Sequence, residues 1–264
     1  MKTDSQSKVG GASPAPTKRY SICITHHNNA ESLGDSLNSI LDQIDDSYEV
    51  VIVDNCSDDG SEKLLKNYEE KGKIKLISRK CSRGEGRQVA LENSVGQYVI
   101  SHVDMDDVYE RRLQELIDFY HTKCEGKVMV AISRPGDWAQ NVTIGPRHLI
   151  VKIGGWRDLQ FGDDWDLWSR AALSSSYSWT VFPMSDRHRD RRSRSGISKT
   201  LRFRFIKYRD GMRLGRDVFR KEDEVSLSQK AVKFLARVSL FIHPSSLKEF
   251  NRNFKAADPA YFVS

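Results

Sequence analysis

Three aspartates, Asp104, Asp106 and Asp107, follow an apolar run at 98–103 that is typical of a buried strand in a parallel sheet. Ligands of open α/β sheets bind beside the carboxyl ends of the strands, so these acids stand where chemistry would occur. Side chains alternate along a strand, which predicts that Asp104 and Asp106 share one side while Met105 enters the core. Two close carboxylates repel each other unless a cation lies between them. The spacing indicates Mg²⁺ or Mn²⁺ bound with a substrate phosphate, and the alternative is a polar strand end that caps the next helix.

Polar residues that suit a nucleotide also follow two other predicted strands. The strand at 20–25 runs into THHNN at 25–29, and the strand at 49–54 ends at Asp54, whose carboxylate can accept a hydrogen bond from a base N–H. Four residues after Asp54, the run Asp58, Asp59 and Gly60 is a turn signal, so a loop that caps the following helix is the alternative to a ligand role. Segment 83–88, RGEGRQ, opens a helix with two glycines and two arginines, which suits a diphosphate.

A second acidic pair, Asp163 and Asp164, begins a helix predicted at 163–173. Acids in a first turn are favoured by the helix dipole, which is a sufficient structural explanation for them. Asp166 and Arg170 are four residues apart and are expected to form an ion pair, while Leu167 faces the core. The chemical alternative is a carboxylate that takes a proton from an attacking hydroxyl group.

The elements that must position these residues alternate between strand and helix. Strands are predicted at 20–25, 49–54, 73–78 and 98–104, each followed by a helix with an apolar stripe. This order predicts an α/β fold with a doubly wound, mostly parallel sheet. Shorter strands are predicted farther along, at 128–132, 141–144 and 179–182, and two last helices at 198–222 and 226–242.

Composition divides the chain into three parts. Residues 1–18 have no apolar signal segment and are predicted to be a disordered lead, 19–185 form the α/β domain, and 186–264 form a basic loop and helical extension. Residues 187–221 hold 14 Lys and Arg against three Asp, a net charge of +11, whereas the whole chain carries +6. An acidic partner should therefore bind in that basic segment.

The order of these motifs resembles that of a family-2 glycosyltransferase with the GT-A fold. The matching segments are THHNN at 25–29, VDNCSDDGS at 53–61, RGEGRQVALENSVGQYV at 83–99, DMDD at 104–107, and GGWR at 154–157 with GDDWDLWSR at 162–170. Each is weak alone, but five in order at family-like spacing are specific, and together they cover residues 19–175. The sequence departs from the family at Thr25, which replaces a proline, at His27, which replaces an aromatic residue, and at Asn29, which replaces an acid. The Q-x-x-R-W motif of processive synthases is absent, which indicates transfer of one sugar at a time.

The resemblance implies roles for individual residues. Asp164 would be the catalytic base, with Asp163 beside it and in contact with the acceptor. Asp104 and Asp106 would bind Mn²⁺ or Mg²⁺, which neutralises charge on the leaving diphosphate. The residues expected to bind the nucleotide sugar are Thr25, His27, Asn29, Asp54, Arg87 and Asp104.

The predicted activity is therefore metal-dependent, inverting transfer of a single sugar from a nucleotide-diphosphate sugar to a hydroxyl of a glycan or lipid-linked glycan. UDP is favoured over GDP on family frequency.

One alternative function is that of a sugar-1-phosphate nucleotidyltransferase, which would need a glycine-rich, lysine-bearing loop where this chain has THHNN. Another is a non-enzymatic nucleic-acid-binding protein acting through 187–221. No nucleic-acid-binding motif is visible, so no nucleic-acid partner is expected.

The predicted helix at 226–242 bears on where the protein works. It is amphipathic, with Lys230, Lys233 and Arg237 opposite an apolar stripe. It is expected to pack on its own domain or in a homodimer, and the alternative is peripheral contact with anionic lipid. The four cysteines form no C-x-x-C pair and are interpreted as buried thiols of a reducing compartment. The reduced cysteines and the lack of a stretch long enough to span a membrane together predict a cytoplasmic protein.

Overall fold

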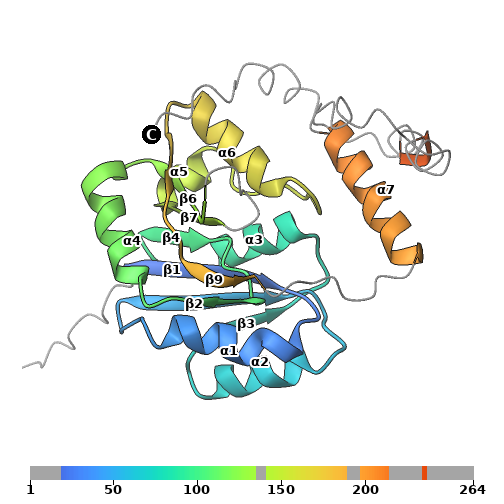
Figure 1. Ribbon diagram of the computed structural model, residues 1–264, viewed down its shortest axis with the longest axis horizontal. Coiled ribbons are helices and arrows are strands. Elements are labelled where there is room, and N and C mark those ends of the chain that lie inside the picture. Colours follow the sequence, from blue (N-terminus) through green and yellow to red (C-terminus); the bar gives the residue numbers. More distant parts are fainter. Residues whose placement is uncertain (1–18, 135–140, 189–196, 214–233, 237–264) are drawn as a thin grey trace, which may run out of the picture.

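The computed structural model describes residues 19–134, 141–188, 197–213 and 234–236. A seven-stranded sheet in the order β3-β2-β1-β4-β7-β6-β8 forms its centre (Figure 1). The strands are β1 (Tyr20–His26), β2 (Tyr48–Asp54), β3 (Lys75–Ser78), β4 (Tyr98–Ser101), β6 (Val128–Ile132), β7 (Asn141–Pro146) and β8 (Tyr177–Val181). Strand β1 is parallel to β2 and β4, β2 is parallel to β3, and β6 is parallel to β8. Only β7 runs antiparallel to its neighbours in this sheet, which confirms the predicted mostly parallel α/β class.

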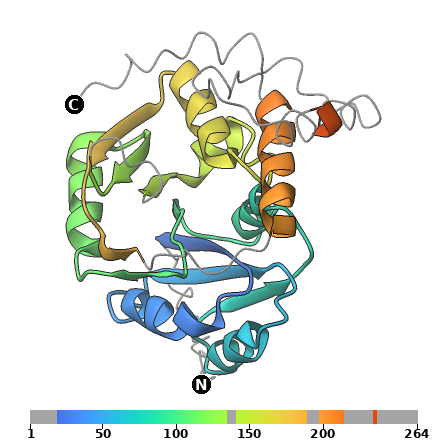
Figure 2. The same cartoon turned by 45° about the vertical axis from the view of Figure 1, so that its right-hand side comes forward.

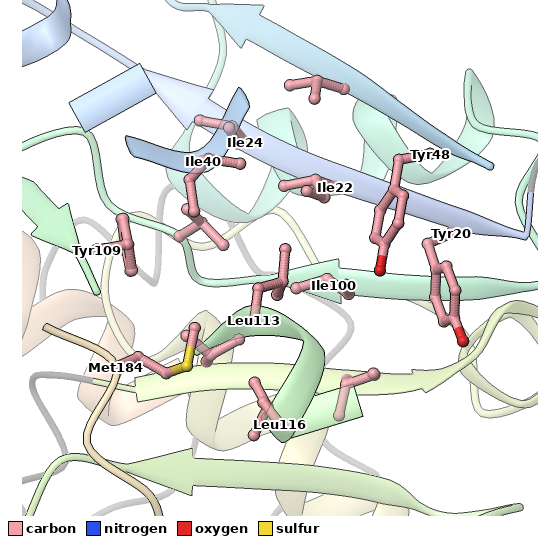
Figure 3. Close-up of a cluster of buried hydrophobic side chains, with 14 of the residues drawn as sticks. Tyr20, Ile22, Ile24, Ile40, Tyr48, Ile100, Tyr109, Leu113, Leu116 and Met184 are labelled. Atoms are coloured by element: carbon pink, nitrogen blue, oxygen red, sulfur yellow. The ribbon is translucent and has the colours of Figure 1, made fainter. Parts of the chain in front are cut away.

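Helices cover both faces of the sheet because its strands are apolar on both sides. On β2, Val50 and Ile52 belong to one buried cluster and Val51 and Val53 to another. Figure 3 shows the first cluster. The first cluster includes residues of α1 (Ala30–Leu41), α2 (Ser61–Glu70) and α4 (Leu113–Phe119), which continues as a π-helical turn at Tyr120–Cys124. The second includes residues of α3 (Arg83–Glu92), α5 (Arg147–Lys152) and α6 (Asp163–Leu173).

The strand that leads to the three aspartates ends earlier than its apolar run predicts. Strand β4 stops at Ser101 because His102 has a φ of +62°, the left-handed conformation, which breaks the extended backbone. Asp104 and Asp106 consequently lie in a turn, although Met105 is buried as predicted. Asp107 begins a short strand, β5 (Asp107–Tyr109), which pairs antiparallel with β9 (Ser185–His188). The sequence predicted neither of these two strands.

The basic extension is described only in part. Helix α7 (Ile197–Arg213) begins one residue before the range predicted at 198–222, and the last part of that range, 214–222, lies outside the described residues, as does the lead at 1–18. The predicted helix at 226–242 also lies outside them, except for 234–236. Among the residues that the structure covers, no helix is long and apolar enough to cross a membrane. Cys23 and Cys124 are buried as expected, but Cys56 is exposed, because it belongs to the loop after β2.

Candidate active site

A cleft of about 260 Å³ opens at the carboxyl ends of β1 and β4. The sheet order reverses at this point, since β1 leads to β2 on one side while β4 lies on the other, and such switch points are where α/β sheets bind ligands. The cleft is lined by Thr25, His26, His27, Asn29, Asn55, Ser82, Arg83, Asp104, Met105, Asp106 and Gln160. Five of the predicted site residues meet here, namely Thr25, His27, Asn29, Asp104 and Asp106. The other four, Asp54, Arg87, Asp163 and Asp164, do not line this cleft.

Asp54 lies behind the cleft wall. Its side chain is fully buried, and its carboxylate accepts hydrogen bonds from the backbone N–H and hydroxyl of Ser57, at 2.9 and 2.5 Å. The carboxylate therefore shapes the loop after β2. The next residue, Asn55, lines the cleft, and its Oδ1 accepts from the Cys81 N–H at 2.9 Å.

The loops after β1 and β2 are joined by side-chain hydrogen bonds. Asn28 donates to Asp58 at 2.7 Å and accepts from its backbone N–H at 2.9 Å. Asp59 accepts from the N–H of Ala30 at 2.8 Å and of Ser61 at 3.0 Å, the first residues of α1 and α2. Burial alone would raise the pKa of Asp59, but the hydrogen bond from the Ser61 hydroxyl, at 2.6 Å, and these two backbone bonds lower it. The helix-capping interpretation of this turn is thus confirmed, and the caps hold one wall of the cleft.

The turn that carries Asp104 and Asp106 is fixed from behind by α1 and its cap. The carbonyl oxygen of Met105 accepts from Asn29 Nδ2 and Ser32 Oγ, both at 2.8 Å. Asn29 was predicted to bind the nucleotide sugar, and in the structure its amide group also holds this turn. Asp104 is exposed on the cleft wall, and Asp106 is 9% exposed.

The chemistry of this wall fits a divalent cation that arrives with its substrate. No group of three or more His, Cys, Asp or Glu residues suited to a metal occurs in the described part of the chain. Two carboxylates do line the cleft, and Mg²⁺ is commonly held by one or two carboxylates together with substrate phosphates. Asp104 and Asp106 therefore suit Mg²⁺ or Mn²⁺ whose remaining ligands come from a diphosphate and water.

Arg83 is the cation of the cleft. Its side chain is exposed at the cleft, and the carboxylates of Asp163, Asp104, Asp164 and Asp106 together raise the pKa of its guanidinium group. Its charge thus interacts with both acidic pairs. A guanidinium group in this position suits the diphosphate of a donor.

Arg87, one helical turn after Arg83, is 6% exposed and forms an ion pair with the fully buried Asp163. The predicted diphosphate role of this arginine therefore suits Arg83 better. The backbone at the start of α3 is also occupied, because the N–H groups of Arg83 and Gly84 donate to Gln160 Oε1 at 3.1 Å and to the Leu159 carbonyl at 2.8 Å. A diphosphate would meet the Arg83 side chain here instead of these two N–H groups.

Asp164 has the properties of a base. Helix α6 begins after Gly162, whose φ of +76° turns the chain so that both acids fall in the first turn. Burial raises the pKa of Asp164 to about 6, the charge of Asp163 adds to this, and Arg87 and Arg83 counteract it. A carboxyl group with this pKa is mostly ionised at neutral pH yet binds a proton more readily than an ordinary aspartate.

Asp166 has a structural role, as predicted. It is fully buried and pairs with Arg170, whose Nη2 lies 2.6 Å from Oδ2. Arg170 also donates to the carbonyl oxygens of Ile153 and Gly155, at 2.5 and 2.6 Å. This pair ties α6 to the GGWR turn, and Leu167 is buried beside it as expected.

Comparison with known proteins agrees with the motifs. The family model described as Glycosyl transferase family 2 matches residues 21–170. The putative teichuronic acid biosynthesis glycosyltransferase TuaG of Bacillus subtilis is 30% identical over 103 residues, which are 38% of this chain and 40% of TuaG. The poly(ribitol-phosphate) beta-N-acetylglucosaminyltransferase TarP of Staphylococcus aureus is 33% identical over 110 residues, which are 39% of this chain and 33% of TarP. The matched part therefore spans less than half the length of either relative.

Two solved structures share the fold at low identity. The S. aureus TarS 1–349 complex with UDP-GlcNAc has a TM-score of 0.54 at 17% identity, covering 85% of this chain and 73% of that one. The mannosyltransferase PcManGT of Pyrobaculum calidifontis, solved with GDP-Man and Mn²⁺, has a TM-score of 0.56 at 17% identity, with 96% and 79% covered. These likenesses establish the GT-A fold.

Proposed function

The chain belongs to glycosyltransferase family 2, and from that premise we propose that it transfers a single sugar from a nucleotide-diphosphate sugar to a hydroxyl group, with inversion. The observation that carries the proposal is the pairing of two sites. A cleft with two carboxylates and Arg83 is also lined by Gln160, four residues before Asp164, and the charge of Asp164 contributes to raising the pKa of Arg83. Donor and base would then act on the same anomeric carbon.

The residues divide the reaction between them. Thr25, His27 and Asn55 would contact the nucleoside end of the donor, and Arg83 the diphosphate. Asp104 and Asp106 would hold Mn²⁺ or Mg²⁺, which when bound supplies positive charge to the leaving diphosphate. Asp164 would remove the proton from the acceptor hydroxyl as it attacks, which is the step that its raised pKa favours. The buried Asp163 pairs with Arg87, so its proposed role is to act on the neighbouring Asp164 and not to contact the acceptor.

The donor base and the acceptor are proposed from relatives. TarS was solved with UDP-GlcNAc, and the name of TarP gives an N-acetylglucosaminyl group and a poly(ribitol-phosphate) acceptor. PcManGT was solved with GDP-Man, so both bases occur on this fold. We favour UDP and a hydroxyl-rich glycan or lipid-linked glycan. The matched family gives no support to the nucleotidyltransferase or nucleic-acid-binding alternatives.

A donor-hydrolysis screen tests the proposal because it needs no acceptor. UDP-GlcNAc, UDP-glucose, UDP-galactose and GDP-mannose are incubated with the full chain and Mn²⁺, and released UDP or GDP is measured. We expect one donor to be hydrolysed, EDTA to stop the reaction, and Asp106→Ala to abolish it. Lys66→Gln on α2, which removes an exposed ion pair to Glu62, is the matched control and should behave as wild type. Metal-independent hydrolysis equal in wild type and Asp106→Ala would refute the metal assignment.

A further inference from the structure

Helix α7 holds the loop that precedes the acidic pair through one buried carboxylate. Asp210 is fully buried, and its Oδ2 accepts from the backbone N–H groups of Gln160 and Phe161, at 2.9 and 3.1 Å. Its Oδ1 faces Arg209 Nε at 2.8 Å and Arg213 Nη1 at 3.5 Å. Figure 2 shows α7 (orange) along one side of the molecule. A buried carboxyl group that accepts hydrogen bonds from two backbone N–H groups of a distant loop fixes that loop in place.

The loop is held from the other side by α3. Gln160 Oε1 accepts from the Arg83 N–H, and the Leu159 carbonyl accepts from the Gly84 N–H at 2.8 Å. Arg213 adds a second link from α7, donating to the Asp158 carbonyl at 3.0 Å. Residues 158–161 are therefore fixed between α3, which carries Arg83, and α7.

Two functional elements depend on where this loop lies. Gln160 lines the donor cleft together with Asp104, Asp106 and Arg83. Two residues after Gln160, Gly162 turns the chain into α6, which starts at Asp163 and Asp164. A shift of the loop would move a wall of the cleft and the base together.

We propose that Asp210 is a positioning residue, which sets Gln160 in the donor cleft and Asp164 at its edge by holding the 158–161 loop against α3. The kinetic effect of Asp210 rests on the proposed function, whereas the contact between Asp210 and the loop does not depend on that function. It also gives the basic extension a role in the active site, since the only acid of α7 contacts the catalytic domain. Asp210 acts through these neighbours and need not touch substrate.

Hydrogen exchange tests the contact directly. In Asp210→Ala the N–H groups of Gln160 and Phe161 lose their acceptor, so we expect exchange of the 157–162 segment to accelerate at least tenfold while β1 and β2 stay unchanged. Asp210→Asn retains an oxygen that can accept both N–H groups, so its exchange should lie between wild type and Asp210→Ala. Met212→Ala, a half-buried change on the same helix, is the control and should leave the segment protected.

Kinetics test the positioning role. For donor hydrolysis in Asp210→Ala we expect kcat to fall at least tenfold, with the Kd of UDP and Mn²⁺ changed less than threefold, because Thr25, His27 and Asn55 remain in place. Asp210→Asn should recover part of kcat, and Met212→Ala should keep it all.

Faster exchange with unchanged kcat would overturn the positioning role, and unchanged exchange would overturn the contact itself. If wild type hydrolyses no donor, the proposed function fails while the exchange result still decides the contact. If Asp210→Ala does not fold, Asp210→Asn decides both.

Discussion

The raised pKa of Asp164 predicts how the rate depends on pH. With a pKa of about 6, the carboxylate is about 9% ionised at pH 5 and about 91% ionised at pH 7, so a rate that needs the base form rises about tenfold. An aspartate with its ordinary pKa near 3.9 would already be more than about 90% ionised at pH 5, and the rate would be nearly flat. We expect the steep profile for kcat of transfer, measured at saturating donor and constant ionic strength.

Removing the neighbouring charge should shift this profile. Burial is the larger cause of the raised pKa of Asp164 and Asp163 the second, so Asp163→Asn should move the midpoint of the profile below pH 6. The same change leaves Arg87 buried without its partner, which costs about 3–5 kcal/mol of stability for a buried pair. The profile must therefore be measured at a temperature where the variant remains folded, as followed by circular dichroism.

Asp164→Asn isolates the base itself. The substitution keeps the shape and a hydrogen-bonding group but cannot take a proton, so transfer should fall by about 10²–10⁴ with donor binding retained. Because the folded state raises the pKa of Asp164, the ionised carboxylate destabilises the folded protein. This loss of stability is absent below the pKa of the unfolded state and grows as the pH rises to the pKa of the folded state. Because the native environment raises this pKa, Asp164→Asn should be more stable than wild type at pH 7, and the difference should be smaller at pH 5. Urea unfolding at the two pH values measures both.

Three results would contradict this reasoning. A flat rate between pH 5 and 7 would show that no group with a pKa near 6 limits transfer. Equal stability of wild type and Asp164→Asn at pH 7 would show that the native environment does not disfavour the charge. Full transfer by Asp164→Asn together with loss of transfer in Asp163→Asn would make Asp163 the base.

Other parts of the site give further predictions. Asp106→Ala should abolish Mn²⁺-dependent binding of UDP in calorimetry with Tm within about 3 °C of wild type, and retained binding would remove Asp106 from the metal site. Gly84→Ala should lower Tm and the rate of transfer, because a Cβ there would lie 2.0 Å from the backbone oxygen of Arg157, and a wild-type Tm would show that this approach is not required. If the segment at 226–242 contacts lipid, changing its cations Lys230, Lys233 and Arg237 to glutamine should release the protein from anionic vesicles without affecting UDP binding. Each lost charge should weaken the binding free energy by about 1 kcal/mol. A wild type that floats with neither anionic nor neutral vesicles would exclude the contact.

The regular elements of the catalytic domain were largely predictable from apolar patterning. Strand β6 and helix α6 match their predicted bounds, because each is a periodic run with clear ends. The end of β4 was not predictable, since the apolar run continues through Val103 while the backbone turns at His102. His102 itself is a core residue, with Nδ1 3.1 Å from Ser101 Oγ, and burial lowers its pKa well below the ordinary value. Strands β5 and β9 were missed because each is four residues or fewer and pairs with a segment far away in the sequence.

Site residues that belong to a motif could be predicted from the sequence, whereas residues that only a tertiary contact brings to the site could not. Asn55, Ser82 and Gln160 line the cleft, yet none was among the predicted site residues, although Asn55 belongs to the VDNCSDDGS motif. Asp210 was hidden for a different reason. In the sequence it is one acid among 14 cations at 187–221, and only the fold brings it to the N–H groups of Gln160 and Phe161, which lie far earlier in the chain.

The motif at the start of α3 does not reveal which of its two arginines meets the substrate. Arg83 and Arg87 are four residues apart and so lie on the same face of the helix in successive turns. Which of them meets the substrate depends on where α6 crosses, and α6 covers the second turn, so that Arg87 pairs with Asp163 while Arg83 remains at the cleft. The acids Asp104, Asp106, Asp163 and Asp164 then face two guanidinium groups, which leaves an excess of negative charge. Such an excess would favour a divalent cation at Asp104 and Asp106, and the charge of Asp163 adds to the raised pKa that suits Asp164 to the proposed role of base.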